Sequence, residues 1–228
     1  MVFWPNCARQ TKAHRILRSV TASVIQYAAL TPGCRGSWLC QRNLLAGSYT
    51  QSGYPRLADD DYQTIDERCL NSFLEIYGED ILAPICDPCV SRHGESALVT
   101  QLIDKGYDAE GGCLFEHNAK TIITNPPYKR DVVDKIAGEI LAQVKEGRVK
   151  WAAMLVRSGW DLAKKRQYLF DDPAFSGLVR LTFRPWWTSS RKAQPIHGYQ
   201  WVVLEHDKYL DYLDEGYDEP ADVWHVYL

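Results

Sequence analysis

The residues best suited to chemistry form the run Asn125-Pro126-Pro127-Tyr128, which follows a short apolar segment. An amine attached to an aromatic ring is a poor nucleophile, because its lone pair is delocalised into the ring. The Asn125 side-chain oxygen and the Pro126 carbonyl can each accept one hydrogen from such an amine, which localises the lone pair on nitrogen. This catalysis works by positioning and electrostatic stabilisation and needs no strong base.

The other two residues of the run suit the same chemistry. Two successive prolines hold the backbone rigid, and Pro127 has no N–H group to compete for the acceptors. Tyr128 can stack on the flat face of the acceptor, as aromatic side chains do with bases outside a helix. The alternative interpretation is a plain Pro-Pro turn after a strand, with Tyr128 covering the core.

The elements that must position this run alternate between strands and helices. Apolar periodicity predicts helices over 67–77, 95–105, 132–145 and 162–170, and short apolar runs predict strands over 81–86, 120–124, 151–156, 178–183 and 199–204. Such alternation indicates an α/β domain with a mainly parallel sheet. These sheets bind ligands beyond the carboxyl ends of their strands, where Asp87 and Asn125 both fall.

With its strand context, Asn125-Pro126-Pro127-Tyr128 resembles motif IV of the class I S-adenosylmethionine-dependent methyltransferases that act on planar nitrogens. The resemblance is strongest to the adenine-N6 DNA methyltransferases, including small phage-type members, and it covers about residues 59–206. It implies a Rossmann-like fold with a mainly parallel sheet and an antiparallel last strand. It also implies methyl transfer from S-adenosylmethionine to adenine N6 in DNA, with catalytic roles for Asn125, Pro126, Pro127 and Tyr128.

The resemblance also implies a cofactor site. Tyr62-Gln63-Thr64 is similar to an N-terminal motif that lines the cofactor pocket, and Ile85-Cys86-Asp87-Pro88-Cys89 is similar to the first strand and the start of motif I. An acidic residue near the second strand would hold the ribose. The expected cofactor-binding residues are Tyr62, Thr64, Asp87, Pro88, Cys89, Ser91, Gly94, Asp108 and Glu110.

The chain departs from that family pattern at three points. Ser91 and His93 stand where two motif I glycines are usual, and Gly111-Gly112 occupies the region where the acid is usual. The segment from Gly112 to Thr124 is also short for a third strand. Glycines there let the backbone approach the cofactor closely. A methyltransferase-like protein that has lost its cofactor and binds nucleic acid or a partner is therefore a second hypothesis.

Charge is distributed in blocks. Residues 1–58 hold seven Lys/Arg and no acidic residue, whereas 205–228 hold eight acidic residues and one basic residue. Residues 145–192 hold 11 basic and four acidic residues, and this excess favours phosphate contact, with a solvated helix face as the alternative. The expected nucleic-acid-binding residues are Lys129, Arg130, Arg184, Trp186, Trp187, Arg191 and Lys192. One of the two tryptophans packing against the sheet is the competing interpretation.

Composition sets the remaining expectations. The chain of 228 residues is 46% hydrophobic and 24% charged, which is typical of a soluble globular protein without a membrane span. Seven cysteines without a convincing secretory signal indicate a reducing cytoplasm, and a lone Cys86-x-x-Cys89 pair predicts no metal site. We expect residues 1–58 to be a basic extension, either a transit peptide, a flexible arm or sequence upstream of the true start, and 59–228 to be the methyltransferase-like domain with an acidic tail.

Three substrates remain open on sequence grounds. DNA adenine is favoured, but methyltransferases of RNA adenine and of protein glutamine use the same Asn-Pro-Pro-Tyr logic, since an amide nitrogen is also planar and delocalised. Residues 1–58 do not look like the helical substrate-binding domain that a glutamine methyltransferase carries. The sequence therefore favours DNA as the partner and leaves the recognition sequence and the oligomeric state undefined.

Overall fold

The computed structural model describes residues 62–91, 94–112, 114–189, 196–215 and 222–226, so the expected 1–58 extension lies outside the described residues. The elements are α2 (Glu67–Tyr77), β1 (Ile85–Asp87), α3 (Ala97–Asp104), β2 (Ala109–Gly111), β3 (Thr121–Thr124), α4 (Arg130–Lys145), β4 (Trp151–Arg157), η2 (Trp160–Leu162), η3 (Lys164–Arg166), α5 (Gln167–Phe170), β5 (Phe175–Leu181), β6 (Tyr199–Glu205), α6 (His206–Glu215) and β7 (Asp222–Val226).

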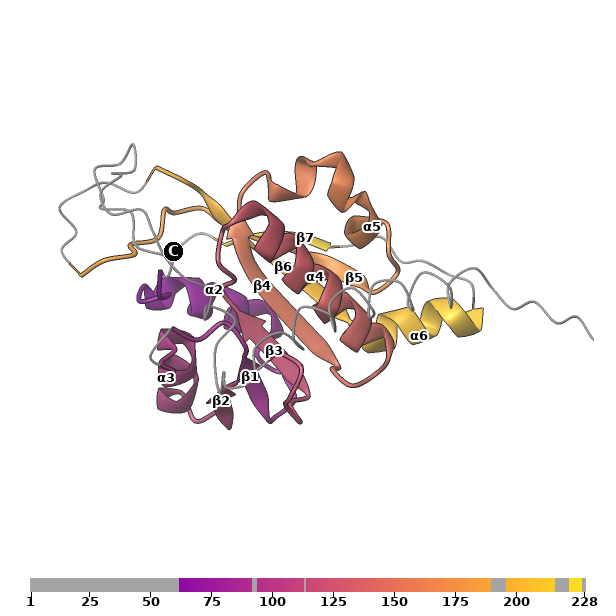
Figure 1. Cartoon of the computed structure of the whole chain (residues 1–228), viewed down its shortest axis with the longest axis horizontal. Helices are drawn as coiled ribbons and strands as arrows, with labels where there is room; N and C mark the ends of the chain where they lie inside the picture. The colour runs from indigo at the N-terminus through magenta and orange to yellow at the C-terminus, as the bar shows by residue number, and fades with distance from the viewer. Residues whose placement is uncertain (1–61, 92–93, 113, 190–195, 216–221, 227–228) are drawn as a thin grey trace, which may run out of the picture. The chain divides into compact units, whose positions relative to one another are not determined.

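Within the described ranges, the strands form one sheet in the order β2-β1-β3-β4-β6-β5-β7 (Figure 1). Strands β2, β1, β3 and β4 are parallel, and β6 runs antiparallel to both β4 and β5. The expected α/β class and mainly parallel sheet with an antiparallel strand are confirmed. The antiparallel strand is β6, however, and the last strand in the chain is β7, which pairs parallel with β5.

Several parts of the chain differ from the sequence-based expectations. The strand expected over 81–86 covers only Ile85–Asp87, the strand expected over 178–183 is Phe175–Leu181, and β2 was not among the expected strands. The single helix expected over 162–170 is three short helical segments, because Ala163 has extended backbone angles and the Arg166 side chain donates to the Trp160 carbonyl at 2.5 Å. The acidic tail, for which no element was predicted, forms α6 and then β7. The tail therefore extends the sheet beyond β5.

The sheet has a hydrophobic core on each of its faces. On one face, α4 places Ile136 and Ile140 against Ile122 and Met154 (Figure 1). On the other face, α2 and α3 pack against the alternate strand residues, among them Ile123, Leu155 and Trp201. Burial on both sides explains why these strands read as continuous apolar runs. None of the helices in the described part of the chain is long and apolar enough to cross a membrane.

The chain order creates a topological switch point between β1 and β3. From β1 the chain crosses through α3 to β2 on one side, and it then returns to β3 on the other side of β1. The helix after β1 and the helix after β3 lie on opposite faces. Ligands of open α/β sheets bind at such a switch point, outside the carboxyl ends of the strands. Here those two strand ends are Asp87 and Thr124.

We predict that Ile123→Ala lowers the free energy of unfolding by about 2–5 kcal/mol, because it leaves a cavity in the core beneath α2 and α3. The side chain of Ile123 is fully buried in β3. Ile103→Ala is the matched control, since Ile103 in α3 is 54% exposed, and it should change stability by no more than about 0.5 kcal/mol. Urea denaturation of both variants measures the difference, and equal losses would contradict the described packing.

Candidate functional site

The carboxylate of Asp87 joins three elements at the carboxyl end of β1. Its Oδ1 atom accepts from the Thr124 hydroxyl at 2.7 Å and from the Cys89 N–H at 3.0 Å. Its Oδ2 atom accepts from the Ser96 hydroxyl at 2.6 Å, and Ser96 is also the N-cap of α3. Burial raises the pKa of Asp87, and these hydrogen bonds act against that rise. The end of β1, the end of β3 and the start of α3 are thereby fixed to one another.

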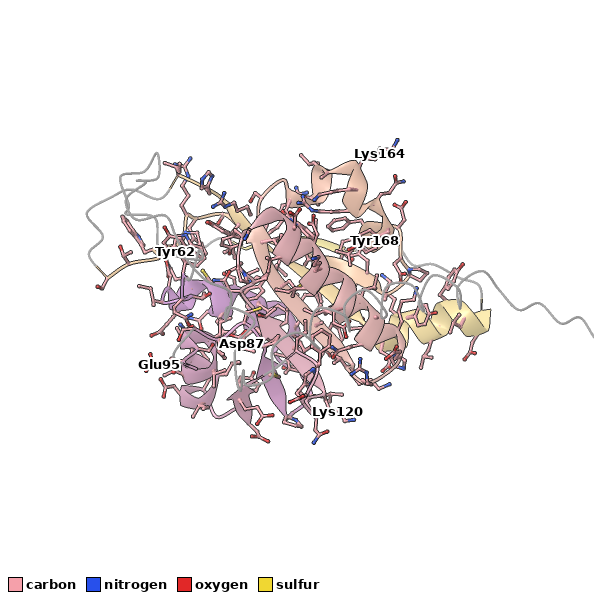
Figure 2. All side chains as sticks on the ribbon, in the orientation of Figure 1. Tyr62, Asp87, Glu95, Lys120, Lys164 and Tyr168 are labelled. Carbon is pink, nitrogen blue, oxygen red and sulfur yellow. The ribbon has the colours of Figure 1, made fainter. Side chains whose placement is uncertain are left out.

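The segment 62–64 connects α3 to Asn125. The Ala97 N–H donates to Gln63 Oε1 at 3.1 Å, and Gln101 Nε2 donates to the Thr64 carbonyl at 2.6 Å. Asn125 Nδ2 donates to the Tyr62 carbonyl at 2.9 Å. Figure 2 shows Lys120, which precedes β3, at the opposite end of the strands from Tyr62. Tyr62, Thr64 and Asn125 therefore lie at the same edge of the sheet as Asp87.

The hydrogen bond to Tyr62 orients the Asn125 amide. Because the amide nitrogen is engaged, the side-chain oxygen of Asn125 is the acceptor left for another donor. Pro126 and Pro127 are buried, while Asn125 itself is half-buried. A rigid, buried Pro-Pro unit thus holds a correctly oriented amide at the end of β3.

In the described arrangement, Tyr128 supplies that donor. Its hydroxyl donates to Asn125 Oδ1 at 2.5 Å, with the Leu155 carbonyl at 3.4 Å. Burial raises the pKa of Tyr128 well above its ordinary value, so the hydroxyl remains protonated and able to donate. Its ring lies 5.5 Å from that of Tyr199 and 6.3 Å from that of Trp187, measured between ring centroids. Tyr128 packs inward here, with its hydroxyl over the Asn125 oxygen.

The loop after β1 contains the expected motif I residues. Asp87 is followed by Pro88 and Cys89, and the Ser91 hydroxyl accepts from the Glu95 N–H at 3.2 Å. Gly94 has φ +81°, a conformation that favours glycine, and a Cβ there would meet only open space. The first glycine after Asp87 is therefore Gly94, one residue beyond position 93, where the second motif I glycine is expected.

The structure does not bring Asp108 and Glu110, the two acidic candidates near β2, together with the other residues of the site. Asp108 precedes β2, and its carbonyl accepts from the Ile85 N–H at 2.8 Å at the start of β1, so it lies away from the carboxyl edge. Glu110 is exposed within β2, opposite Cys86. At the end of that strand, a Cβ on Gly111 would lie 2.6 Å from a Val90 methyl group, so the loop after β1 packs directly on this glycine.

The segment after β5 reaches the same edge. The Trp186 N–H donates to Asp66 Oδ2 at 3.0 Å, at the N-terminus of α2. Trp187 is half-buried and packs edge-on against Tyr199 at 4.8 Å between ring centroids. This is the packing role weighed as the alternative to base stacking. Arg184 is exposed beside these two tryptophans.

Of the other residues expected to contact nucleic acid, two begin α4 and two lie outside the described residues. Lys129 is exposed and stands at the N-cap position of α4. Arg130 is the first residue of α4, and its side chain is outside what the structure describes. Arg191 and Lys192 lie outside the described residues.

Sequence reasoning missed four residues of this site. Thr124 and Ser96 hold Asp87, and both had a signal: a polar residue ending an apolar strand, and a serine immediately before a helix. Arg157 and Tyr199 surround Tyr128, but nothing in the sequence brings them together. Only the antiparallel pairing of β4 with β6 places Arg157 opposite Tyr199.

No protein-family model and no curated protein sequence matches this chain. Among solved structures, it is similar to a protein assigned to the class I S-adenosylmethionine-dependent methyltransferases from Listeria monocytogenes, with 11% identity, a TM-score of 0.41, and coverage of 96% of this chain and 74% of that one.

Two further solved structures show a comparable likeness. A dimethyladenosine transferase from Plasmodium falciparum has 14% identity and a TM-score of 0.34, covering 69% of this chain and 62% of that one. A modification subunit of a type I restriction enzyme from Vibrio vulnificus has 13% identity and a TM-score of 0.39, covering 99% of this chain and 54% of that one. This chain thus spans less than two thirds of either protein. Likeness at this level assigns neither family nor activity, and the fold class follows from the strand order.

We predict that Asp87→Asn makes the protein's stability less dependent on pH. An acid whose pKa is raised on folding binds more protons in the folded state, so its contribution to the free energy of unfolding falls as pH rises from its ordinary pKa of 3.8 through the raised value. The asparagine variant lacks this loss, because it keeps an oxygen acceptor and carries no charge. Urea denaturation between pH 4 and pH 8 measures the difference between the two proteins.

Asp87→Ala provides the comparison for the carboxylate's hydrogen bonds. It leaves the Thr124 and Ser96 hydroxyls and the Cys89 N–H without their acceptor, and each buried group so orphaned costs about 1–3 kcal/mol. The alanine variant should therefore be less stable than the asparagine variant at pH 7. Equal stability of the two would mean that these hydrogen bonds do not hold the strand ends together.

Proposed function

We propose that this protein is an S-adenosylmethionine-dependent methyltransferase that acts on a planar amine nitrogen, with adenine N6 in DNA as its substrate. The observation that carries the proposal is the position of Asn125-Pro126-Pro127. This run follows β3 directly at the topological switch point, beside the buried carboxylate of Asp87, and its amide is oriented by a backbone carbonyl. Ligands of open α/β sheets bind at that position.

The strand order supports the same proposal. A parallel set β2-β1-β3-β4, followed by a reversed β6 inserted between β4 and β5, agrees with the sheet that the motif resemblance implied. In this arrangement the loop after β1 and the loop after β3 leave neighbouring parallel strands at the same end of the sheet. One loop is positioned to hold a cofactor and the other to hold the acceptor amine.

Asn125 and Pro126 perform the proposed chemistry on the acceptor. The amine donates one hydrogen to Asn125 Oδ1, where it takes the place of the Tyr128 hydroxyl, and a second hydrogen to the Pro126 carbonyl. The two acceptors draw the nitrogen towards tetrahedral geometry and stabilise the positive charge that develops during transfer. Tyr128, once released from Asn125, is free to stack on the ring that carries the amine.

S-adenosylmethionine, when bound, supplies an activated methyl group on a sulfonium. The residues near β1 fit this cofactor at one clear point: Thr64 is 2% exposed, and its hydroxyl oxygen has no hydrogen-bond partner within the described part of the chain. A buried polar atom left unpaired costs about 1–3 kcal/mol, which a ligand group can recover. Tyr62, Thr64, Ser91 and Gly94 are the residues proposed to hold the cofactor.

A non-catalytic methyltransferase-like protein is the second candidate. It is favoured by the close packing of Val90 on Gly111, at the strand end where a ribose-binding acid is usual. This candidate predicts a folded chain that does not bind S-adenosylmethionine. Calorimetric titration of the full chain with the cofactor separates the two, since micromolar binding supports the enzyme and no binding supports the second candidate.

We predict that Asn125→Ala reduces methyl transfer to DNA by about 100- to 1000-fold, because it removes one of the two acceptors at the reacting nitrogen. Transfer of a labelled methyl group from S-adenosylmethionine to DNA, RNA and protein substrates measures the loss and identifies the substrate. Cofactor affinity should change little, since Asn125 contacts the acceptor.

Asn118→Ala is the matched control, because Asn118 is exposed in the turn before β3. It should keep wild-type transfer rates. An Asn125→Ala variant that methylates at the wild-type rate would contradict the role proposed for this residue. Transfer to RNA or protein alone would retain the mechanism and replace the substrate.

A further inference from the structure

A positively charged cluster lies at the carboxyl edge of the sheet, outside the residues that act on the amine. Arg157 ends β4, and its guanidinium carbon lies 5.2 Å from the centroid of the Tyr128 ring. The side chain of Arg157 is exposed, and no carboxylate within the described ranges forms an ion pair with it. The Tyr128 ring thus positions a guanidinium that forms no ion pair with a carboxylate of the described residues.

Two further basic side chains lie near Arg157. The Ser158 N–H donates to the Gly198 carbonyl at 3.0 Å, which places His197 beside the end of β4. Partial burial, and then the charges of Arg157 and Arg184, lower the pKa of His197 from its ordinary 6.5, so its imidazole is neutral at pH 7 and offers a ring N–H donor beside the two guanidinium groups. Arg184 and His197 are both exposed. Like charges brought together at a surface favour an anionic partner.

We propose that Arg157, Arg184 and His197 bind the phosphate backbone of the nucleic-acid strand whose base enters the site at Asn125. The choice of a nucleic-acid partner rests on the proposed function. The assignment of these residues rests on their location, because Arg157 contacts the same Tyr128 ring whose hydroxyl covers the Asn125 oxygen. Phosphate contacts fix the register of a strand without reading its sequence. This cluster therefore positions the strand, and Arg157 links the backbone contact to the residue that must move.

Fluorescence anisotropy of the full chain with a labelled DNA duplex, and with the corresponding single strand, tests this inference at several NaCl concentrations. The experiment contains no S-adenosylmethionine, so its result is independent of cofactor binding and methyl transfer. Each lost phosphate contact reduces the slope of log K against log salt by about 0.9 for duplex and about 0.7 for single strands. Arg157→Gln should reduce the slope by about that amount and weaken binding at every salt concentration.

Two matched variants complete the test. Arg148→Gln removes the same charge at the opposite edge of the sheet, where Arg148 pairs with Glu146 and Glu139, and it should keep the wild-type slope. Arg157→Lys keeps the charge and should retain most of the slope, which distinguishes a phosphate contact from a structural role at Tyr128. The inference is overturned if the wild-type chain binds neither nucleic acid, or if Arg157→Gln and Arg148→Gln change the slope equally.

Discussion

The candidate site depends on the hydrogen bonds that the buried carboxylate of Asp87 accepts. This carboxylate accepts hydrogen bonds from Cys89 in the loop after β1, from Thr124 at the end of β3 and from Ser96, the N-cap of α3. Its burial is unfavourable for a charged group, and those three donors offset part of that cost. These hydrogen bonds fix the positions of two loops relative to each other, because the loop after β1 and the loop after β3 start from strand ends that bind the same side chain. Asn125 is the next residue after Thr124, so the hydrogen bond between Thr124 and Asp87 also fixes the position of Asn125.

A second chain of contacts at the candidate site runs through Tyr128. Asn125 is oriented by the Tyr62 carbonyl and covered by the Tyr128 hydroxyl, while the Tyr128 ring is held by Tyr199, Trp187 and Arg157. These residues come from five separate parts of the chain. The Asn125 oxygen is therefore available only to an incoming donor that displaces the Tyr128 hydroxyl.

Local pattern was enough to predict most of the elements. The helix over 67–77 begins and ends at the predicted residues, and the strands at 121–124, 151–157 and 199–205 differ from prediction by one residue at most at each end. Their apolar residues are buried on both faces, which gives short, strong signals. The run 162–170 was harder, because the Arg166 side chain satisfies the Trp160 carbonyl in place of a helical backbone bond. The tail was missed because its acidic composition hides β7, whose pairing with β5 is long-range.

The site could be predicted where its residues are adjacent in the sequence. It could not be predicted where strand pairing brings together residues that are distant in the sequence. Asn125 to Tyr128 form one run, and the position of that run after a strand could be read directly. The inward packing of Tyr128 could not, because it depends on Tyr199 and Trp187, about 60 to 70 residues away in the sequence. The neighbourhood of Arg157 has the same origin, since a basic residue in a basic stretch has no sequence feature that distinguishes it from a solvated one.

The reversed direction of β6 has a consequence for how such a protein can change in evolution. Because β5 ends and β6 begins at the carboxyl edge of the parallel strands, the described parts of their connection, 182–189 and 196–198, leave and rejoin the sheet at the edge that holds the candidate site. Insertions or deletions in this connection can alter the surface near the candidate site while the hydrogen-bonded strands on either side keep their register. Under the proposed function, the choice of target can therefore diverge through this connection while the end of β3 and the carboxylate that fixes it stay unchanged.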